Sequence, residues 1–222
     1  MINIAIDGPS GAGKSTVAKA LAKELHFVYV DTGAKYRAIG VYVRGHGIDK
    51  NNADAVIAAL PDIRVSLDYA EDGTQIVLLN GEDVSTVIRE NEISLYASTV
   101  SKIPEVRARL LSLQREMAQT HNVIMDGRDI GTVVLPNACV KIFMSAHPEI
   151  RAKRRYKELL SKGNQVTYDD VYRDMVERDK NDSTRASCPC VPAKDAVLFD
   201  NSALSLEETL SGALKIIEGK MQ

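Results

Sequence analysis

The chain contains no tryptophan, and only 5% of its 222 residues are aromatic. Proteins that hold single-stranded nucleic acid without sequence preference stack the bases on aromatic side chains, so this composition disfavours that class. The formal net charge is −2, and no basic tract is present. Nucleic-acid-binding proteins usually carry a clear excess of positive charge. We therefore expect no nucleic-acid partner.

Long apolar runs and paired cysteines are also missing. No stretch approaches the length of a membrane-spanning helix, and no basic region precedes the short apolar segment near the first residue. The three cysteines, Cys139, Cys188 and Cys190, are odd in number and lack the paired spacing of a zinc site. This pattern indicates unpaired thiols in a reducing compartment. We expect a cytoplasmic monomer that contacts no membrane.

Short apolar runs alternate with helical periodicity along most of the chain, and 45% of the residues are hydrophobic. Strand patterns occur at 2–6, 27–30, 123–125, 140–144 and 197–199. Helical patterns occur at 14–26, 36–43, 92–102, 104–119, 148–162, 168–180 and 206–217. This alternation predicts an α/β fold of three layers, with helices on both faces of an open parallel sheet. In such sheets ligands bind at the carboxyl ends of the strands.

The segment 62–79 has a different pattern of strand and turn signals. Two strand patterns, at 62–69 and 75–79, flank a turn signal at Glu71-Asp72-Gly73, and a second turn signal follows at Asn80-Gly81. Neighbouring strands joined by turns are typical of antiparallel pairing. We predict one domain over 1–222, with a core of about 1–60 and 92–222 and a small antiparallel inset at about 61–91.

The first strand pattern leads into the segment GPSGAGKS, which fits the pattern G-x-x-x-x-G-K-[ST]. Glycines let the backbone N–H groups surround a polyphosphate, and the following helix adds its positive end. An accidental glycine-rich turn is disfavoured, because an apolar strand precedes the motif and a helical pattern follows it. The predicted ATP-binding residues are Gly8, Pro9, Ser10, Gly11, Ala12, Gly13, Lys14, Ser15 and Thr16. Lys14 would reach the terminal phosphates, and Ser15 would ligate Mg²⁺.

A carboxylate, Asp126, follows the strand pattern at 123–125. P-loop proteins keep a carboxylate near the metal at this place, but strands also end in aspartate for reasons of turn geometry. Both interpretations stay open on the sequence alone. The candidate metal ligands are Ser15 and Asp126, the latter directly or through water.

Several arginines lie in polar segments beyond the phosphate loop. The segments 31–37 and 126–132 follow strand patterns, and a charged run spans 177–185. Such a run is usually a solvated helix face. A kinase that joins two phosphates, however, must neutralise two polyanions, and guanidinium groups bind phosphate in pairs of hydrogen bonds. The candidates are Arg37, Arg128, Arg178 and Arg185, with Arg154 and Arg155 on a mobile lid at about 152–166 over ATP.

Taken together, these motifs resemble the bacterial cytidylate kinase family from end to end. The resemblance rests on residues 8–15, 31–37, 126–134 (DGRDIGTVV) and 178–185, and on the inset. It implies phosphorylation of CMP and dCMP by MgATP, with release of ADP, in pyrimidine nucleotide metabolism. Two features depart from the family pattern. Lys35 replaces an apolar residue, and Cys188-Pro189-Cys190 replaces a small residue, proline and leucine.

The resemblance also implies roles for individual residues. Arg37 and Arg128 would hold the acceptor phosphate, and Arg178 and Asp182 the sugar. Ser98, Arg107, Asp129 and Arg185 would face cytosine, while Thr32 and Tyr36 would line the same pocket. The catalytic cations would be Lys14, Arg128 and Arg178. Elementary chemistry supports one of these roles, since a carboxylate such as Asp129 can accept from the N4 amine of cytosine.

The expected reaction is an in-line phosphoryl transfer to a phosphate oxygen, which is already anionic and needs no general base. A kinase with another acceptor is the nearest alternative, and an alcohol acceptor would want a base such as Asp31. A regulatory GTPase should show an N-K-x-D guanine motif, which the sequence lacks. An NTPase that acts on nucleic acid is disfavoured by the net charge.

Overall fold

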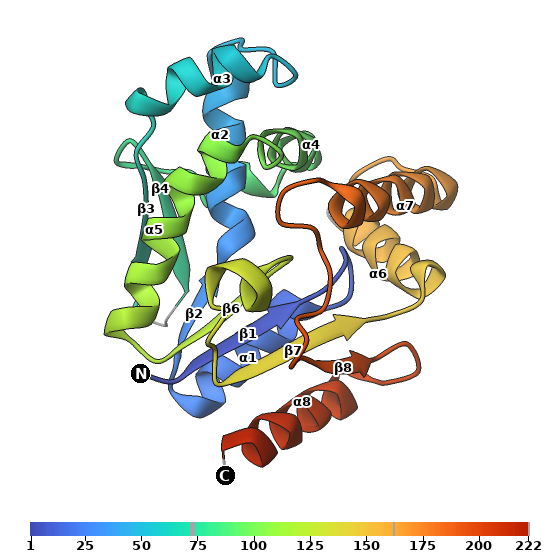
Figure 1. The fold of residues 1–222 in the computed structure, drawn as a ribbon. Coiled ribbons are helices and arrows are strands. Elements are labelled where there is room, and N and C mark those ends of the chain that lie inside the picture. Colours follow the sequence, from blue (N-terminus) through green and yellow to red (C-terminus); the bar gives the residue numbers. More distant parts are fainter. Residues whose placement is uncertain (72–73, 162, 222) are drawn as a thin grey trace. The chain divides into compact units, whose positions relative to one another are not determined.

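The computed structural model describes residues 1–71, 74–161 and 163–221 (Figure 1). The chain forms two compact units. The first unit combines Met1–Phe27 with His121–Gln222, and the second is the continuous segment Val28–Thr120. None of the described helices is long and apolar enough to cross a membrane.

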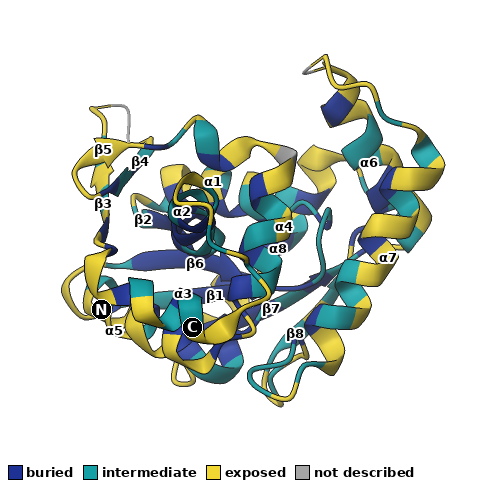
Figure 2. Ribbon diagram, turned by 90° about the horizontal axis from the view of Figure 1, so that it is seen from above, coloured by how far each residue is buried: buried dark blue, intermediate teal, exposed yellow. Residues whose placement is uncertain are grey.

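Four strands of the parallel sheet lie in the first unit, in the order β6-β1-β7-β8. Their bounds are Val123–Gly127 for β6, Asn3–Asp7 for β1, Val140–Ser145 for β7 and Val197–Asp200 for β8. Ile4 of β1 lies opposite Ile124 of β6 and Val140 of β7. Figure 2 colours β6 as buried, and β1 is buried in all of its residues but the first. The apolar runs of β6, β1 and β7 are therefore interior parallel strands, as predicted. The run at 197–199 forms the edge strand β8, which has no buried residue.

Helices of the first unit follow the strands and carry most of the predicted polar segments. They are α1 (Lys14–Leu25), the single π-turn η3 (Ile130–Val134), α6 (Pro148–Ser161), α7 (Tyr168–Thr184) and α8 (Leu206–Met221). Helix α1 packs on β1, β6 and α8, whereas α6 packs on α7. The lid predicted at 152–166 covers most of α6, from residue 152 to its end, and the segment after it, of which residue 162 lies outside the described residues.

The second unit contains a small antiparallel sheet of order β3-β4-β5, as predicted. In chain order its elements are β2 (Val28–Asp31), α2 (Thr32–Gly45), α3 (Ala53–Ala59), η1 (Leu60–Asp62), β3 (Val65–Tyr69), β4 (Gln75–Leu79), β5 (Glu82–Asp83), η2 (Val87–Arg89), α4 (Asn91–Val100) and α5 (Pro104–Thr120). Asn80 and Gly81 both have positive φ, as a two-residue hairpin turn requires. The predicted turn at 71–73 falls partly on residues 72 and 73, which lie outside the described residues.

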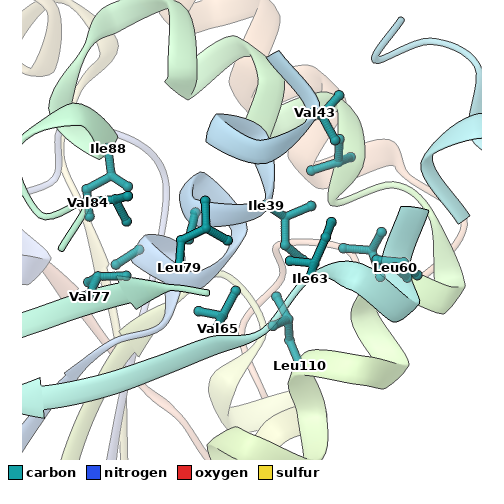
Figure 3. Close-up of a cluster of buried hydrophobic side chains, with 14 of the residues drawn as sticks. Ile39, Val43, Leu60, Ile63, Val65, Val77, Leu79, Val84, Ile88 and Leu110 are labelled. Atoms are coloured by element: carbon teal, nitrogen blue, oxygen red, sulfur yellow. The ribbon is translucent and has the colours of Figure 1, made fainter. Parts of the chain in front are cut away.

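A hydrophobic cluster holds α2 in the second unit (Figure 3). Ile39 and Val43 of α2 belong to it, as do Val65 of β3, Leu79 of β4 and Leu110 of α5. All five side chains are buried. Their burial fixes α2 against the antiparallel sheet and α5, and thereby fixes the polar residues of its first turns.

Candidate functional site

The phosphate loop joins the end of β1 to the start of α1. Gly8 has a φ of 143°, and a Cβ atom at this position would lie 1.9 Å from the carbonyl oxygen of Met144. Gly13, with a φ of 87°, stands at the N-cap of α1, where no side chain caps the helix. The first N–H groups of α1 therefore stay available to an anion.

Lys14 is folded back onto this loop. Its side chain is 5% exposed, and its Nζ donates to the carbonyl oxygen of Pro9 at 2.7 Å. Burial, together with the smaller effect of the nearby positive charge of Arg128, lowers the pKa of Lys14 to about 7. The site therefore disfavours the charged form of Lys14 when no nucleotide is bound. A bound polyphosphate would stabilise that charge.

Ser15 and Asp126 meet at the same edge of the sheet. The hydroxyl of Ser15 donates to Oδ2 of Asp126 at 2.8 Å. No group of three or more His, Cys, Asp or Glu side chains able to hold a metal occurs among the described residues. A hydroxyl beside a carboxylate fits Mg²⁺, which takes one or two protein oxygens and fills its remaining positions with water and phosphate.

A cluster of arginines and carboxylates lies beside the loop. Arg128 Nε donates to Asp182 Oδ2 at 2.9 Å, and Arg185 NH2 lies 3.5 Å from Asp129 Oδ1. Burial opposes ionisation of Asp182, but Arg128 and Arg178 outweigh it and hold its pKa below the usual value. The sequence-predicted residues Arg128, Asp129, Arg178, Asp182 and Arg185 are thus brought together in the first unit, with paired charges.

Segment 188–190, one of the departures from the family pattern, holds this cluster through its backbone. Arg185 Nε donates to the carbonyl oxygen of Cys188 at 2.6 Å. The N–H of Cys190 donates to the carbonyl oxygen of Asp182 at 2.8 Å. The three cysteines are free thiols. Since the contacts are made by the main chain, other side chains at these positions can preserve them.

Asp7 is a buried residue of the site that sequence reasoning did not single out. Its carboxylate accepts from the N–H groups of Ile130 and Gly131, both at 2.7 Å. Burial raises the pKa of Asp7 to about 6, although these two hydrogen bonds oppose the shift. Asp7 thereby ties η3, and the preceding DGRD segment, to the end of β1. An acid at a strand end was visible in the sequence, but its partners were not.

The two predicted lid arginines lie on α6 and have different partners. Arg154 donates to Oδ1 of Asn201 at 3.2 Å and to its carbonyl oxygen at 3.0 Å. Asn201, which sequence reasoning missed, donates from Nδ2 to the carbonyl oxygen of Ala12 at 2.9 Å. Arg155 donates to Glu158 at 2.9 Å. Arg154 is therefore linked to the phosphate loop through Asn201.

In the second unit, Asp31 caps α2 and pairs with arginine. Its Oδ1 accepts from the N–H of Ala34 at 2.9 Å, and its Oδ2 accepts from Arg37 NH2 at 2.7 Å. Arg89 lies 3.6 Å from the same oxygen. A carboxylate held by these donors is a poor general base, which disfavours an alcohol acceptor. Arg37 Nε is buried and has no acceptor in the described part of the chain. A buried donor without an acceptor is expected where an anionic ligand binds.

The remaining predicted residues of this unit lie on α2, α4 and the start of α5. Arg107 lies over the Tyr36 ring, 5.5 Å from its centroid, and its NH1 is 3.4 Å from the carbonyl oxygen of Ser101. The carbonyl oxygen of Ser98 accepts from the Ser101 hydroxyl at 2.9 Å. Thr32 is buried one helical turn before Tyr36, so the two residues share a face of α2.

Lys35, the other departure from the family pattern, is buried beside these residues on α2. Only 2% of its surface is exposed. Burial lowers the pKa of Lys35 to about 8, and Glu116 of α5 opposes the shift. The aliphatic stem of a lysine can occupy the volume that an apolar residue would fill.

The chain resembles known proteins over almost its whole length. Residues 4–219 match the family model described as cytidylate kinase. The chain is 50% identical over 217 residues to the cytidylate kinase of Caldicellulosiruptor bescii, covering 97% of this chain and 95% of that protein. It is 48% identical over 220 residues to the cytidylate kinase of Flavobacterium johnsoniae, covering 97% and 96%. A solved structure of an uncharacterized protein from Eubacterium ventriosum has a similar fold, with a TM-score of 0.54 at 13% identity, over 98% of this chain and 99% of that chain.

Proposed function

The chain belongs to the cytidylate kinase family, and we propose that it transfers the γ-phosphoryl group of ATP to the phosphate of CMP and dCMP, with release of ADP. One observation supports this most strongly. The hydroxyl of Ser15, next to Lys14, donates to Asp126 at 2.8 Å. Arg128 follows two residues after Asp126 and is held by Asp182 at 2.9 Å. A fixed arginine thus lies close to the phosphate loop, where it can bind the phosphate of an acceptor.

On the donor side, residues Gly8 to Thr16 would surround the ATP phosphates, with Arg154 and Arg155 as the lid arginines. Ser15 and Asp126 would hold Mg²⁺. When bound, Mg²⁺ neutralises charge on the phosphates and helps to align them. Lys14 would leave Pro9 for the terminal phosphates, where its buried charge gains a partner.

On the acceptor side, Arg37 and Arg128 would bind the CMP phosphate, while Arg178 and Asp182 would contact the sugar. The pairing of Asp182 with Arg128 fixes the orientation of both side chains before substrate binds. Arg178 would be the third catalytic cation. Residues proposed to recognise or enclose the base are Thr32, Tyr36, Ser98, Arg107, Asp129 and Arg185. No proton need be removed from a phosphate oxygen, so these groups act by position and charge.

An assay of ADP release across the nucleoside monophosphates tests this function. We expect CMP and dCMP to stimulate ADP release strongly, and AMP, GMP and alcohol acceptors to leave it near the rate without acceptor. Equal stimulation by an alcohol and by CMP would contradict the assignment of a phosphate acceptor.

Asp129 is expected to determine the preference for cytosine over uracil. Its buried carboxylate makes no capping hydrogen bond to η3, so a role confined to turn geometry is disfavoured. It would accept from the N4 amine of CMP but face O4 of UMP with no proton between them. A buried unpaired polar group costs about 1–3 kcal/mol, which corresponds to roughly tenfold to several hundredfold in kcat/KM. Asp129→Ala should therefore impair CMP far more than UMP.

The measurement is kcat/KM for CMP and UMP in the wild type and in Asp129→Ala. A ratio of the two values that stays unchanged in the variant would show that the base is recognised elsewhere. Thermal unfolding of both proteins separates this effect from a loss of stability.

Nucleotide binding is expected to take up a proton above neutral pH. The pKa of Lys14 is lowered to about 7 by burial and by Arg128, so Lys14 is mostly neutral at about pH 8.5 before ATP binds. Bound phosphates raise that pKa again, so binding should take up about one proton there and none at about pH 5.5. ATP affinity should accordingly weaken as pH rises above neutral. Calorimetric titrations in buffers of different ionisation enthalpy measure this uptake.

Lys14→Arg supplies the matched control, because arginine stays charged throughout this range. Equal proton uptake by the wild type and Lys14→Arg would contradict the assignment to Lys14.

A further inference from the structure

Ser10, near the tip of the phosphate loop, is held by two side chains that have no role in the reaction described above. Arg151 NH1 donates to the carbonyl oxygen of Ser10 at 2.8 Å. The N–H of Ser10 lies 3.3 Å from Asp179 Oδ1 and donates to it. Both backbone groups of one loop residue are thus bound by side chains from two helices, α6 and α7. Neither interaction requires a ligand to be present.

These two side chains also bind each other. Arg151 NH1 lies 2.5 Å from Asp179 Oδ2, and Arg151 is 4% exposed. Arg151 Nε donates to the carbonyl oxygen of Ala146, just after β7, at 2.7 Å. The packing around Gly11 is equally close, since a Cβ there would lie 3.2 Å from Arg151 Cβ and 3.1 Å from Met175 Cε. A buried arginine with these partners has one orientation, so it fixes the loop firmly.

Helix α7 also carries two residues of the proposed acceptor site, Arg178 and Asp182. Arg178 directly precedes Asp179. Asp182 lies three residues after Asp179 and accepts from Arg128 Nε at 2.9 Å. The same helix therefore binds the donor loop at Ser10 and the acceptor cation Arg128. We propose that Arg151 and Asp179 are positioning residues, which lock the phosphate loop to α7 so that the donor phosphates and the acceptor arginine keep a fixed separation.

This inference rests on the proposed transfer from ATP to CMP. The reacting atoms must stay aligned, and a misplacement of about 1 Å can slow a reaction about a hundredfold. We expect Asp179→Ala to lower kcat for CDP formation by roughly tenfold to a hundredfold, with KM for CMP within about threefold of wild type. Asp179→Asn keeps an acceptor for the Ser10 N–H, so its kcat should lie between those of Asp179→Ala and the wild type. Asp174→Ala, at an exposed position of α7, is the matched control and should resemble the wild type.

Asp179→Ala also leaves Arg151 as a buried charge without its partner, which should lower Tm. The double variant Arg151→Met with Asp179→Leu removes both charges and keeps the site filled. It should recover Tm, because apolar residues often replace a buried ion pair without loss of stability. Its kcat should be as low as that of Asp179→Ala or lower, because Ser10 has then lost its partners on both helices.

The outcomes separate the possibilities. A double variant that regains kcat together with Tm would overturn the positioning role and leave only a structural one. Single variants of Asp179 with the same kcat as Asp174→Ala would overturn it as well. A wild-type protein that forms no CDP would instead contradict the proposed function itself.

Discussion

Replacing Lys14 by methionine is expected to lower kcat/KM for phosphoryl transfer to CMP by about a hundredfold to a thousandfold, since one preorganised donor at a developing anion contributes that much in comparable sites. The fold should survive. Lys14 is buried, and its surroundings lower its pKa to about 7. The site therefore disfavours the ammonium group before nucleotide binds. A neutral methionine of similar length should leave Tm equal to or above that of the wild type.

The measurements are steady-state kinetics of CDP formation and thermal unfolding without nucleotide. Lys23→Met, at an exposed position near the end of the same helix, is the matched control and should alter neither quantity. Retention of more than about a tenth of wild-type kcat/KM by Lys14→Met would remove the basis for a phosphate-binding role.

Replacing Gly8 by alanine is expected to destabilise the protein by about 3 kcal/mol or more, because two costs add. The added Cβ would lie 1.9 Å from the carbonyl oxygen of Met144, which belongs to the backbone of β7. No side-chain rotation can relieve such a contact, so the loop or the strand must move. The φ of 143° at Gly8 is also one that alanine rarely adopts.

Gly45→Ala is the matched control for this substitution. Gly45 is the last residue of α2, a Cβ built there meets nothing within 4 Å beyond its chain neighbours and the helix's own nearby backbone, and its φ is not in the positive range. Alanine is preferred to glycine in helices, so this variant should be stabilised by up to about 1 kcal/mol. Chemical denaturation of both variants gives the comparison. Equal stability of Gly8→Ala and wild type would show that the loop does not pass so close to β7.

The sequence predicts the parts of the fold in which local pattern and tertiary position agree. The phosphate loop is one of these. Its three residues with positive φ are all glycines, and the buried strand before it and the helix after it both lie within the first 25 residues of the chain. The interior parallel strands are another, since burial on both faces leaves an uninterrupted apolar run. In contrast, β5 is a two-residue exposed strand with no apolar alternation to reveal it.

The candidate site was only partly predictable, because several of its contacts join distant segments. Ser10 and Asp179 are 169 residues apart, and Asn201 and Ala12 are 189 residues apart. In the sequence, Asp179 is one charge in a charged run that is indistinguishable from a solvated helix face. Asn201 follows the end of β8 and Asp7 is the last residue of β1, but the sequence does not show which segment either side chain binds. Such pairings follow from topology, which local patterns leave undetermined.

The most direct test of the proposed activity follows the transferred phosphoryl group itself. ATP labelled at the γ-phosphate is incubated with CMP, Mg²⁺ and the wild-type protein, and the products are separated by chromatography. Our account predicts one labelled CDP for each ADP formed, with the label in its β-phosphate. Label that appears in inorganic phosphate at the rate of ADP release, with no labelled CDP, would contradict it.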